Sequence, residues 1–138
     1  MITAVDTSVL LDVLAADPEH GERSREALRT AFSSGALVAC DVVWAEVRAH
    51  FSDDDDCVEV FARLGIRFEP LSVAAATLAG RLWRQYRQRS RAPRSLVVAD
   101  FLIGAHASLQ GDALLTRDRG FYRDYFVDLR VIDPAGRG

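Results

Sequence analysis

The sequence predicts an α/β fold in which a small parallel sheet of four to five strands is covered by helices on both faces. Short apolar runs alternate with longer segments whose apolar residues recur at helical spacing along all 138 residues. This alternation favours parallel strands joined by right-handed helical crossovers, stacked in three layers, α/β/α. The composition is that of a packed domain, since 49% of the residues are hydrophobic and 27% are charged. We therefore expect residues 1–138 to form a single domain.

The first predicted strand, at residues 2–5, is a short apolar run rich in β-branched residues. Asp6 follows it at once, at the end of a strand where open α/β sheets bind their ligands. Thr7 or Ser8 can cap the next helix, whose apolar residues within 9–14 recur at helical spacing. Taken alone, Asp6 is better explained as a helix cap or a turn residue. Whether Asp6 belongs to a functional site depends on whether other carboxylates lie close to it.

The next part of the chain predicts two helices around a second strand. Residues 22–32 form an amphipathic helix, and residues 37–40 form the strand. A helix then runs from Asp41, which can cap it, to about residue 51. Glu46 shares one face of this helix with Val43, Val47 and His50 at three- and four-residue spacing, so it is flanked by core positions. A helical glutamate usually faces solvent, and this spacing is what makes Glu46 a candidate site residue.

Four consecutive acids at residues 53–56 precede a helix predicted at residues 57–64. They look like a metal site, but four consecutive side chains cannot all face one ion. Acidic residues at a helix N-terminus are favoured by the helix dipole in any case. We interpret this acidic run as a solvated cap. A third strand is predicted at residues 66–68, before Pro70.

A long helix is predicted from Ser72 to about residue 88. Its end and the following loop carry six arginines, more than the capping of a helix C-terminus requires. They indicate a surface for RNA phosphates, a solvated face or a partner-binding edge. The six are Arg81, Arg84, Arg87, Arg89, Arg91 and Arg94.

The most informative segment is the apolar helix predicted at residues 96–107, in which Asp100 is the only acid. Burying an unpaired carboxylate costs several kcal/mol, so an acid in this apolar helix indicates a partner or a function that offsets the cost. The fourth strand, at residues 113–116, is followed at once by Arg117 and Asp118. The chain closes with a short helix or turn and a last strand, predicted at residues 120–126 and 130–132.

Other features of the composition narrow the class of protein. No apolar run approaches the roughly 20 residues of a membrane helix, and the N-terminus lacks a signal-peptide pattern, so we expect a cytoplasmic protein without membrane association. Cys40 and Cys57 have no CxxC spacing and look like buried thiols in a reducing compartment. His20, His50 and His106 show no ligand spacing and are interpreted as surface or packing residues. The net charge of −3 means that nucleic acid can bind only at a local basic patch.

Four of the acids are predicted to meet at one cleft. Asp6 and Asp118 follow strand ends, and Glu46 and Asp100 lie in helices on the same side of the sheet. Two carboxylates about 4 Å apart repel by roughly 4 kcal/mol at an effective dielectric near 20, so a bare cluster is unstable. A hard divalent cation removes this repulsion. Because no Cys or His joins the set, the ligands favour Mg²⁺ or Mn²⁺ over zinc.

Four stretches carry a resemblance when taken together: residues 5–11 (VDTSVLL), Glu46, residues 100–107 (DFLIGAHA) and residues 111–118 (GDALLTRD). In this order and spacing the chain resembles the PIN domain family, specifically the VapC toxins of bacterial toxin–antitoxin pairs. The resemblance covers almost the whole chain, and the combination is specific although each piece is weak. It implies that four acids form the catalytic quartet and that two hydroxyls orient it. These residues are Asp6, Glu46, Asp100 and Asp118, with Ser8 and Thr116.

The resemblance also implies an activity and partners. The activity is hydrolysis of RNA phosphodiester bonds with Mg²⁺ or Mn²⁺, held by Asp6, Asp100 and Asp118, with Glu46 acting through a water or a second ion. The implied partner is a small VapB-like antitoxin that lays a C-terminal segment across the cleft. A homodimer within a larger toxin–antitoxin assembly is implied as well, with DNA bound only through the antitoxin. Three arginines are candidate RNA contacts, namely Arg91, Arg94 and Arg117.

Two other classes of protein remain to be weighed. A haloacid-dehalogenase-like phosphatase also opens with a strand-terminal Asp, but it needs a second Asp two residues on, where this chain has Ser8, and a lysine, which this chain lacks. A PIN-fold binding module that acts mainly through its antitoxin complex is the stronger rival. The apolar stripes of the first two helices are either a partner surface or ordinary core. Their central residues are Leu11, Leu14, Leu28 and Phe32.

Overall fold

The computed structural model describes residues 1–89 and 96–136. Within these residues, five strands form one sheet in the order β3-β2-β1-β4-β5, and every pair of neighbours is parallel. This confirms the predicted parallel sheet. The strands are β1 (Ile2–Val5), β2 (Ala36–Ala39), β3 (Ile66–Phe68), β4 (Ala113–Leu115) and β5 (Val131–Ile132).

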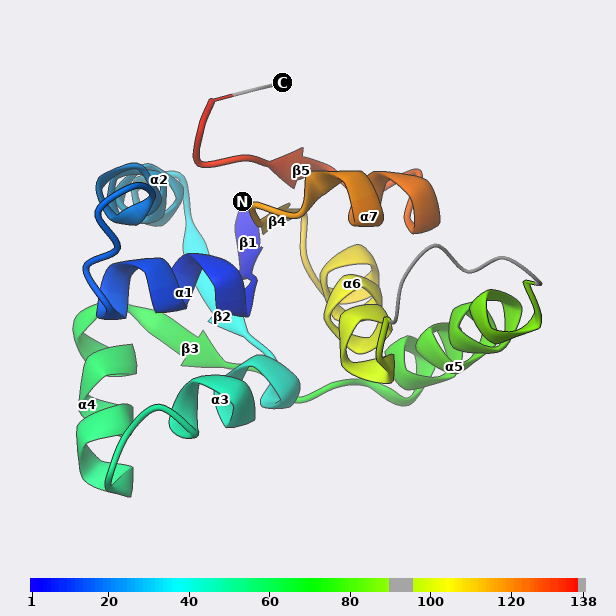
Figure 1. Cartoon of the computed structure of the whole chain (residues 1–138), viewed down its shortest axis with the longest axis horizontal. Coiled ribbons are helices and arrows are strands. Elements are labelled where there is room, and N and C mark those ends of the chain that lie inside the picture. The colour runs from blue at the N-terminus through cyan, green and yellow to red at the C-terminus, as the bar shows by residue number, and fades with distance from the viewer. Residues whose placement is uncertain (90–95, 137–138) are drawn as a thin grey trace.

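Seven helices in the described residues cover the sheet on both faces. Helices α1, α2 and α4 lie on one side of the strands and α5, α6 and α7 on the other (Figure 1). Helix α3 contacts both α1 and α6. No helix of the described chain combines the length and apolar character needed to cross a bilayer. The helices are α1 (Thr7–Leu14), α2 (Gly21–Ser33), α3 (Asp41–Arg48), α4 (Asp54–Arg63), α5 (Val73–Gln88), α6 (Val98–Gln110) and α7 (Arg119–Tyr125).

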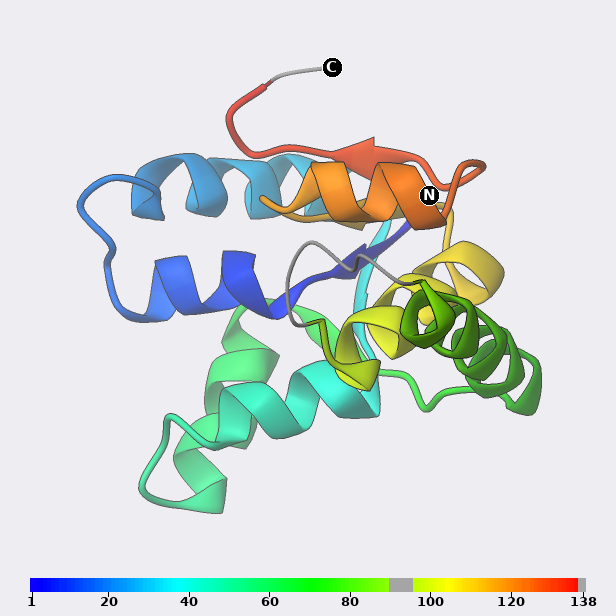
Figure 2. The ribbon, with the colours of Figure 1, turned by 45° about the vertical axis from the view of Figure 1, so that its right-hand side comes forward.

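An aromatic cluster holds α5, α6 and α7 together beneath the sheet. The ring of Phe101, fully buried on α6, lies edge-on to Phe121 of α7 with 5.2 Å between ring centroids and 5.8 Å from Tyr86 of α5. Gly104 allows α6 to approach this layer closely, since a Cβ there would lie 2.3 Å from the ring of Phe126. Figure 2 shows α5 and α6 side by side. The start of α7, which follows Asp118, is therefore anchored by packing.

Two polar contacts set the register of the central strands. The backbone N–H of Ile2 donates to the Asp112 carboxylate at 2.7 Å, and the Asp112 N–H donates to the Ile2 carbonyl at 2.7 Å. Val5 consequently stands opposite Leu115 in the β1–β4 pair. The residues that follow these two strands emerge next to each other at one edge of the sheet.

Two predicted helix caps are wrong. Helix α1 begins at Thr7 with Asp6 at its N-cap position in an extended conformation, so neither Thr7 nor Ser8 caps it. Helix α3 likewise begins at Asp41, after Cys40. The acidic run is a cap, as interpreted, because the Asp53 carboxylate accepts a hydrogen bond from the Asp56 N–H at 2.8 Å.

Candidate active site

Asp6 lies at the carboxyl edge of the sheet, where β1 and β4 end side by side. Its N–H donates to the Leu115 carbonyl at 2.9 Å, which continues the strand pairing by one residue. The Thr116 hydroxyl, which comes next after β4, donates to the Asp6 Oδ2 at 2.6 Å. Asp6 is 7% exposed and Thr116 is fully buried. The sheet thus places a carboxylate and its hydroxyl donor together across 110 residues of sequence.

The Asp6 carboxylate also accepts a hydrogen bond from the Ser8 hydroxyl at 3.1 Å, so the two predicted orienting hydroxyls both contact it. Burial raises the pKa of Asp6 above its ordinary value, because the charged form loses water. The bonds from Thr116 and Ser8 lower this pKa in part, and the negative charge of Glu46 raises it again. A buried carboxylate with hydroxyl donors and acidic surroundings is one that a cation would stabilise.

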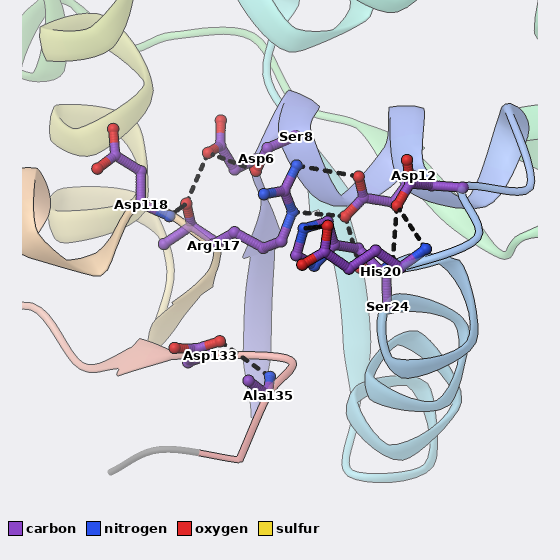
Figure 3. A network of polar contacts seen from close by, with 12 residues as sticks. Asp6, Ser8, Asp12, His20, Ser24, Arg117, Asp118, Asp133 and Ala135 are labelled. Atoms are coloured by element: carbon purple, nitrogen blue, oxygen red, sulfur yellow. Dashed lines mark hydrogen bonds and ion pairs between the residues drawn. The ribbon is translucent and has the colours of Figure 1, made fainter.

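Asp118 is joined to the same hydrogen-bond chain. Its backbone N–H donates to the Thr116 Oγ at 3.0 Å, so one hydroxyl contacts both the Asp6 side chain and the Asp118 backbone. Asp118 itself is exposed, at the N-cap position of α7. Figure 3 shows the Asp6 and Asp118 carboxylates pointing to the same side of the strands.

Glu46 and Asp100 come from helices and are held by other donors. The Glu46 Oε1 accepts a hydrogen bond from the Thr7 hydroxyl at 2.6 Å, which links α3 to α1 beside Asp6. Asp100, in the first turn of α6, accepts from the Val97 N–H at 3.0 Å and so caps its own helix. Glu46 is exposed and Asp100 is half-buried. The helix cap is a structural reason for an acid in this apolar segment that the sequence did not reveal.

Tyr122 connects the four acids. Its side chain is 2% exposed, and burial is the main cause that raises the pKa of its phenol. The negative charges of Asp6, Asp100, Asp118 and Glu46 each raise this pKa further. All four carboxylates therefore lie within electrostatic reach of one phenol. Sequence reasoning missed Tyr122, although it stands one helical turn after Asp118.

The four acids act electrostatically on Tyr122, but they do not form a preformed metal site within the described residues. In residues 1–89 and 96–136, no three acidic, His or Cys side chains stand close enough together to hold a metal ion. Mutual repulsion opposes a closer approach in the absence of a cation. Three of the carboxylates, those of Asp6, Glu46 and Asp100, accept hydrogen bonds from different parts of the fold. The donor chemistry nevertheless fits a hard divalent cation, because the set is all oxygen and its most buried member, Asp6, is destabilised in its charged form.

Arg117 has an ion-pair partner that the sequence did not reveal. Its Nε and Nη2 donate to the two carboxylate oxygens of Asp12 at 2.7 and 3.0 Å. Asp12 is 5% exposed and also accepts from the Ser24 hydroxyl at 2.9 Å. Arg117 as an RNA contact stays a prediction. The other two candidate RNA contacts, Arg91 and Arg94, lie outside the described residues.

Other motifs of the sequence lie apart from this acidic group or serve packing. In the acidic run, Asp54 is 86% exposed at its side chain and pairs with Arg48 at 2.7 Å. His106 is a packing residue, 1% exposed, whose Nε2 lies 2.8 Å from a Glu69 carboxylate oxygen. Both interpretations made from the sequence, a solvated cap and a packing histidine, are confirmed.

Comparisons with known proteins agree on the fold. The PIN domain family model matches residues 3–126. Among solved structures, the chain is similar to VapBC2 from Rickettsia felis bound to a promoter DNA fragment, with a TM-score of 0.72 and 16% identity over 96% of this chain and 98% of that one. The chain is also similar to FitAcB from Neisseria gonorrhoeae, with a TM-score of 0.66 and 22% identity over 99% of this chain and 100% of that one.

A third similar structure is VapC20 from Mycobacterium tuberculosis, described as a sarcin-ricin loop cleaving toxin. Its TM-score is 0.56 and its identity 17%, over 93% of this chain and 98% of that chain. A comparison with curated protein sequences found no match. At these identities the structural likeness establishes the fold alone.

Proposed function

This chain belongs to the PIN domain family, and we propose that it is a metal-dependent endoribonuclease, the toxin of a toxin–antitoxin pair. The observation that carries the proposal is the buried Asp6 carboxylate at the sheet edge, with hydroxyl donors and three further carboxylates around Tyr122. Similar proteins include one described as a toxin that cleaves the sarcin-ricin loop. That description supports RNA as the substrate class.

The residues take distinct roles in this proposal. Asp6, Asp100 and Asp118 would hold Mg²⁺ or Mn²⁺, and Glu46 would act through a bound water or a second ion. The cation, when bound, would polarise a phosphoryl oxygen and lower the pKa of a water. Thr116 contributes by holding the Asp6 carboxylate in place through its 2.6 Å hydrogen bond.

The chemistry is hydrolysis without a covalent protein intermediate. Water attacks phosphorus in line with the departing 3′ oxygen, the P–O3′ bond breaks, and the products carry a 5′-phosphate and a 3′-hydroxyl. The ribose 2′-hydroxyl takes no part in these steps. The preference for RNA therefore has to come from the shape and single-stranded character of the substrate.

A groove between α1, α2 and α4 supports an antitoxin partner. It encloses a volume of about 690 Å³ and is lined by apolar side chains that include Leu28, Phe32 and Leu64. Phe32 is 54% exposed, whereas its neighbour Leu28 is in the core, so the helix stripe is only partly used for folding. Structures similar to this chain are toxin–antitoxin complexes bound to DNA. We propose that the antitoxin covers this groove and carries any DNA contact.

Phe32→Asp tests the groove. The variant should cleave RNA at the rate of the wild type, because Phe32 belongs to the groove and not to the acidic site, and should lose inhibition by the cognate antitoxin. The measurement is RNA cleavage as a function of added antitoxin. Undiminished inhibition would show that the antitoxin binds elsewhere.

The activity is tested with the purified full chain and a panel of structured RNAs. Cleavage should require Mg²⁺ or Mn²⁺, stop with EDTA, be absent in Asp6→Asn, and leave 5′-phosphate ends when the products are sequenced. Cleavage that persists in both EDTA and Asp6→Asn would reject the proposed site. Absence of cleavage in a chain that still binds its antitoxin would instead identify a PIN-fold binding module.

A further inference from the structure

An ion pair with a buried carboxylate ties the candidate active site to the first two helices. The Asp12 carboxylate of α1 accepts three hydrogen bonds, two from Arg117 and one from Ser24 of α2. The guanidinium donates through Nε and Nη2 at 2.7 and 3.0 Å, which is the bidentate geometry that fixes a planar group in orientation as well as position. Asp12 is 95% shielded from solvent, whereas the Arg117 side chain is 36% exposed, so the pair is screened by water and salt from one side only.

Arg117 occupies a particular place in the chain, between two residues of the site. Thr116 before it donates to Asp6, and Asp118 after it donates its N–H back to Thr116. In Figure 3 the Arg117 side chain crosses in front of β1, and its guanidinium reaches the Asp12 carboxylate. The ion pair thus holds the middle of a three-residue segment whose two ends meet the acidic site.

The backbone conformation of Asp118 explains why the anchoring of Arg117 matters for the position of Asp118. Its φ of −97° and ψ of 53° are neither helical nor extended, so regular secondary structure does not fix this residue. The preceding strand β4 ends at Leu115, and α7 begins at Arg119. The placement of Asp118 therefore depends on the Thr116 hydrogen bond and on the anchoring of Arg117, together with the packing of α7, which begins at the next residue.

We propose that Asp12 and Arg117 are positioning residues that set the place of Asp118 and, through it, the affinity of the site for a divalent cation. The inference rests on the proposed function, because it assumes that Asp118 is a ligand. Ser24 completes the clamp by donating to the same carboxylate. In this role Arg117 acts toward the protein, whereas the prediction made from the sequence has it acting toward RNA phosphate.

Matched variants separate the two roles of Arg117. Asp12→Asn removes the ion pair and leaves the arginine able to meet phosphate, whereas Arg117→Lys keeps the positive charge and loses the bidentate geometry. Asp54→Asn is the control, because it breaks the Arg48 pair of equal 2.7 Å length on the exposed surface. The double variant Asp12→Asn/Arg117→Gln replaces the ion pair with a neutral one and guards against an unpaired buried charge.

The readout is Mn²⁺ binding to the metal-free full chain, measured by electron paramagnetic resonance. Asp12→Asn, Arg117→Lys and the double variant should each bind Mn²⁺ roughly 10- to 100-fold more weakly than the wild type, the usual cost of losing a group that orients a metal ligand. Asp54→Asn should bind like the wild type. Saturating Mn²⁺ should restore kcat in the variants, with KM for RNA unchanged, which a general loss of structure would not permit.

Each contrary outcome has a definite meaning. Wild-type affinity for Mn²⁺ in both Asp12→Asn and Arg117→Lys would overturn the positioning role. A raised KM for RNA in Arg117→Lys, with Asp12→Asn unaffected, would overturn it in favour of a phosphate contact. If Asp12→Asn does not fold, the double variant and Arg117→Lys decide the question. Failure of the wild type itself to bind Mn²⁺ would instead reject the proposed function.

Discussion

The two acids that follow strands and the two that come from helices are held in different ways. Asp6 and Asp118 share one buried hydroxyl, that of Thr116, and so are tied to each other through the sheet edge. Glu46 accepts from Thr7 near the protein surface, and Asp100 accepts from the backbone at the start of its own helix. The strand half of the site is tied together through one buried hydroxyl, whereas each acid of the helix half is held by a separate hydrogen bond.

This difference indicates which of the four carboxylates can move when a cation binds. The described acids do not stand close enough together to share an ion as they are. Asp6 is buried and multiply bonded, so its adjustment would cost the most. Glu46 and Asp100 can exchange their local hydrogen bonds for a cation at smaller cost. We therefore expect changes at the strand half to have the larger effects.

Asp6→Asn should have the largest effect. Loss of a charged ligand removes about 4 kcal/mol of transition-state stabilisation, which is roughly a thousandfold in cleavage rate. Single-turnover cleavage of an RNA substrate measures it. A rate within about tenfold of the wild type would be too small for a lost ligand and would remove Asp6 from the proposed mechanism.

The same substitution should make the metal-free protein more stable at neutral pH. Burial raises the pKa of Asp6, so the folded protein holds this proton at a higher pH than the unfolded chain does. Wild-type stability therefore falls as the pH rises through that raised pKa, and Asn has no such loss. Thermal melts in EDTA should show no advantage for Asp6→Asn at low pH and an advantage that grows as the pH rises. A lower melting temperature at neutral pH would indicate that the carboxylate is structural.

Thr116→Val should have the next largest effect, because it removes the hydroxyl that both strand-borne acids use. The Asp6 carboxylate and the Asp118 N–H each lose a partner, at a cost of about 1–3 kcal/mol in stability. Mn²⁺ affinity should fall roughly tenfold. Ser8→Ala is the control, since it removes only the longer 3.1 Å bond to Asp6 and should have a smaller effect. Equal losses in the two variants would contradict a special role for Thr116.

The helix half should be more tolerant. Thr7→Val removes the hydrogen bond to Glu46, and cleavage should slow by about fivefold, as expected for one hydrogen bond to a charged group near solvent. Unfolding free energy should change little. A fall in unfolding free energy in Thr7→Val as large as in Thr116→Val would show that the strand half and the helix half of the site are equally rigid.

The smallest effect is expected at the acidic run. Asp54 is exposed and its carboxylate pairs with Arg48 on the surface, so Asp54→Asn should leave both cleavage and melting temperature unchanged. A large fall in cleavage rate would mean that this run takes part in the site.

The positions of the two strand-borne acids at the sheet edge could be predicted from the sequence, because strand ends leave a clear signal. Asp6 and Asp118 follow short apolar runs, and parallel strands bring such positions to one edge. Asp12 was missed because an acid in an amphipathic helix normally faces solvent, and its partner lies 105 residues away. Tyr122 was missed because its burial depends on how α7 packs against α6. Thr7 was assigned to capping alone, since a sequence cannot show that its hydroxyl turns toward Glu46. Ser8 was predicted to orient the acids only through the family resemblance, and its spacing by itself indicated a cap.

The central claim is that distant acids share one divalent cation, and anomalous diffraction from crystals soaked in Mn²⁺ tests it most directly. The account predicts a manganese peak bound by Asp6, Asp100 and Asp118, lost in crystals of Asp6→Asn. A peak at any other place, or none at a concentration that supports RNA cleavage, would contradict it.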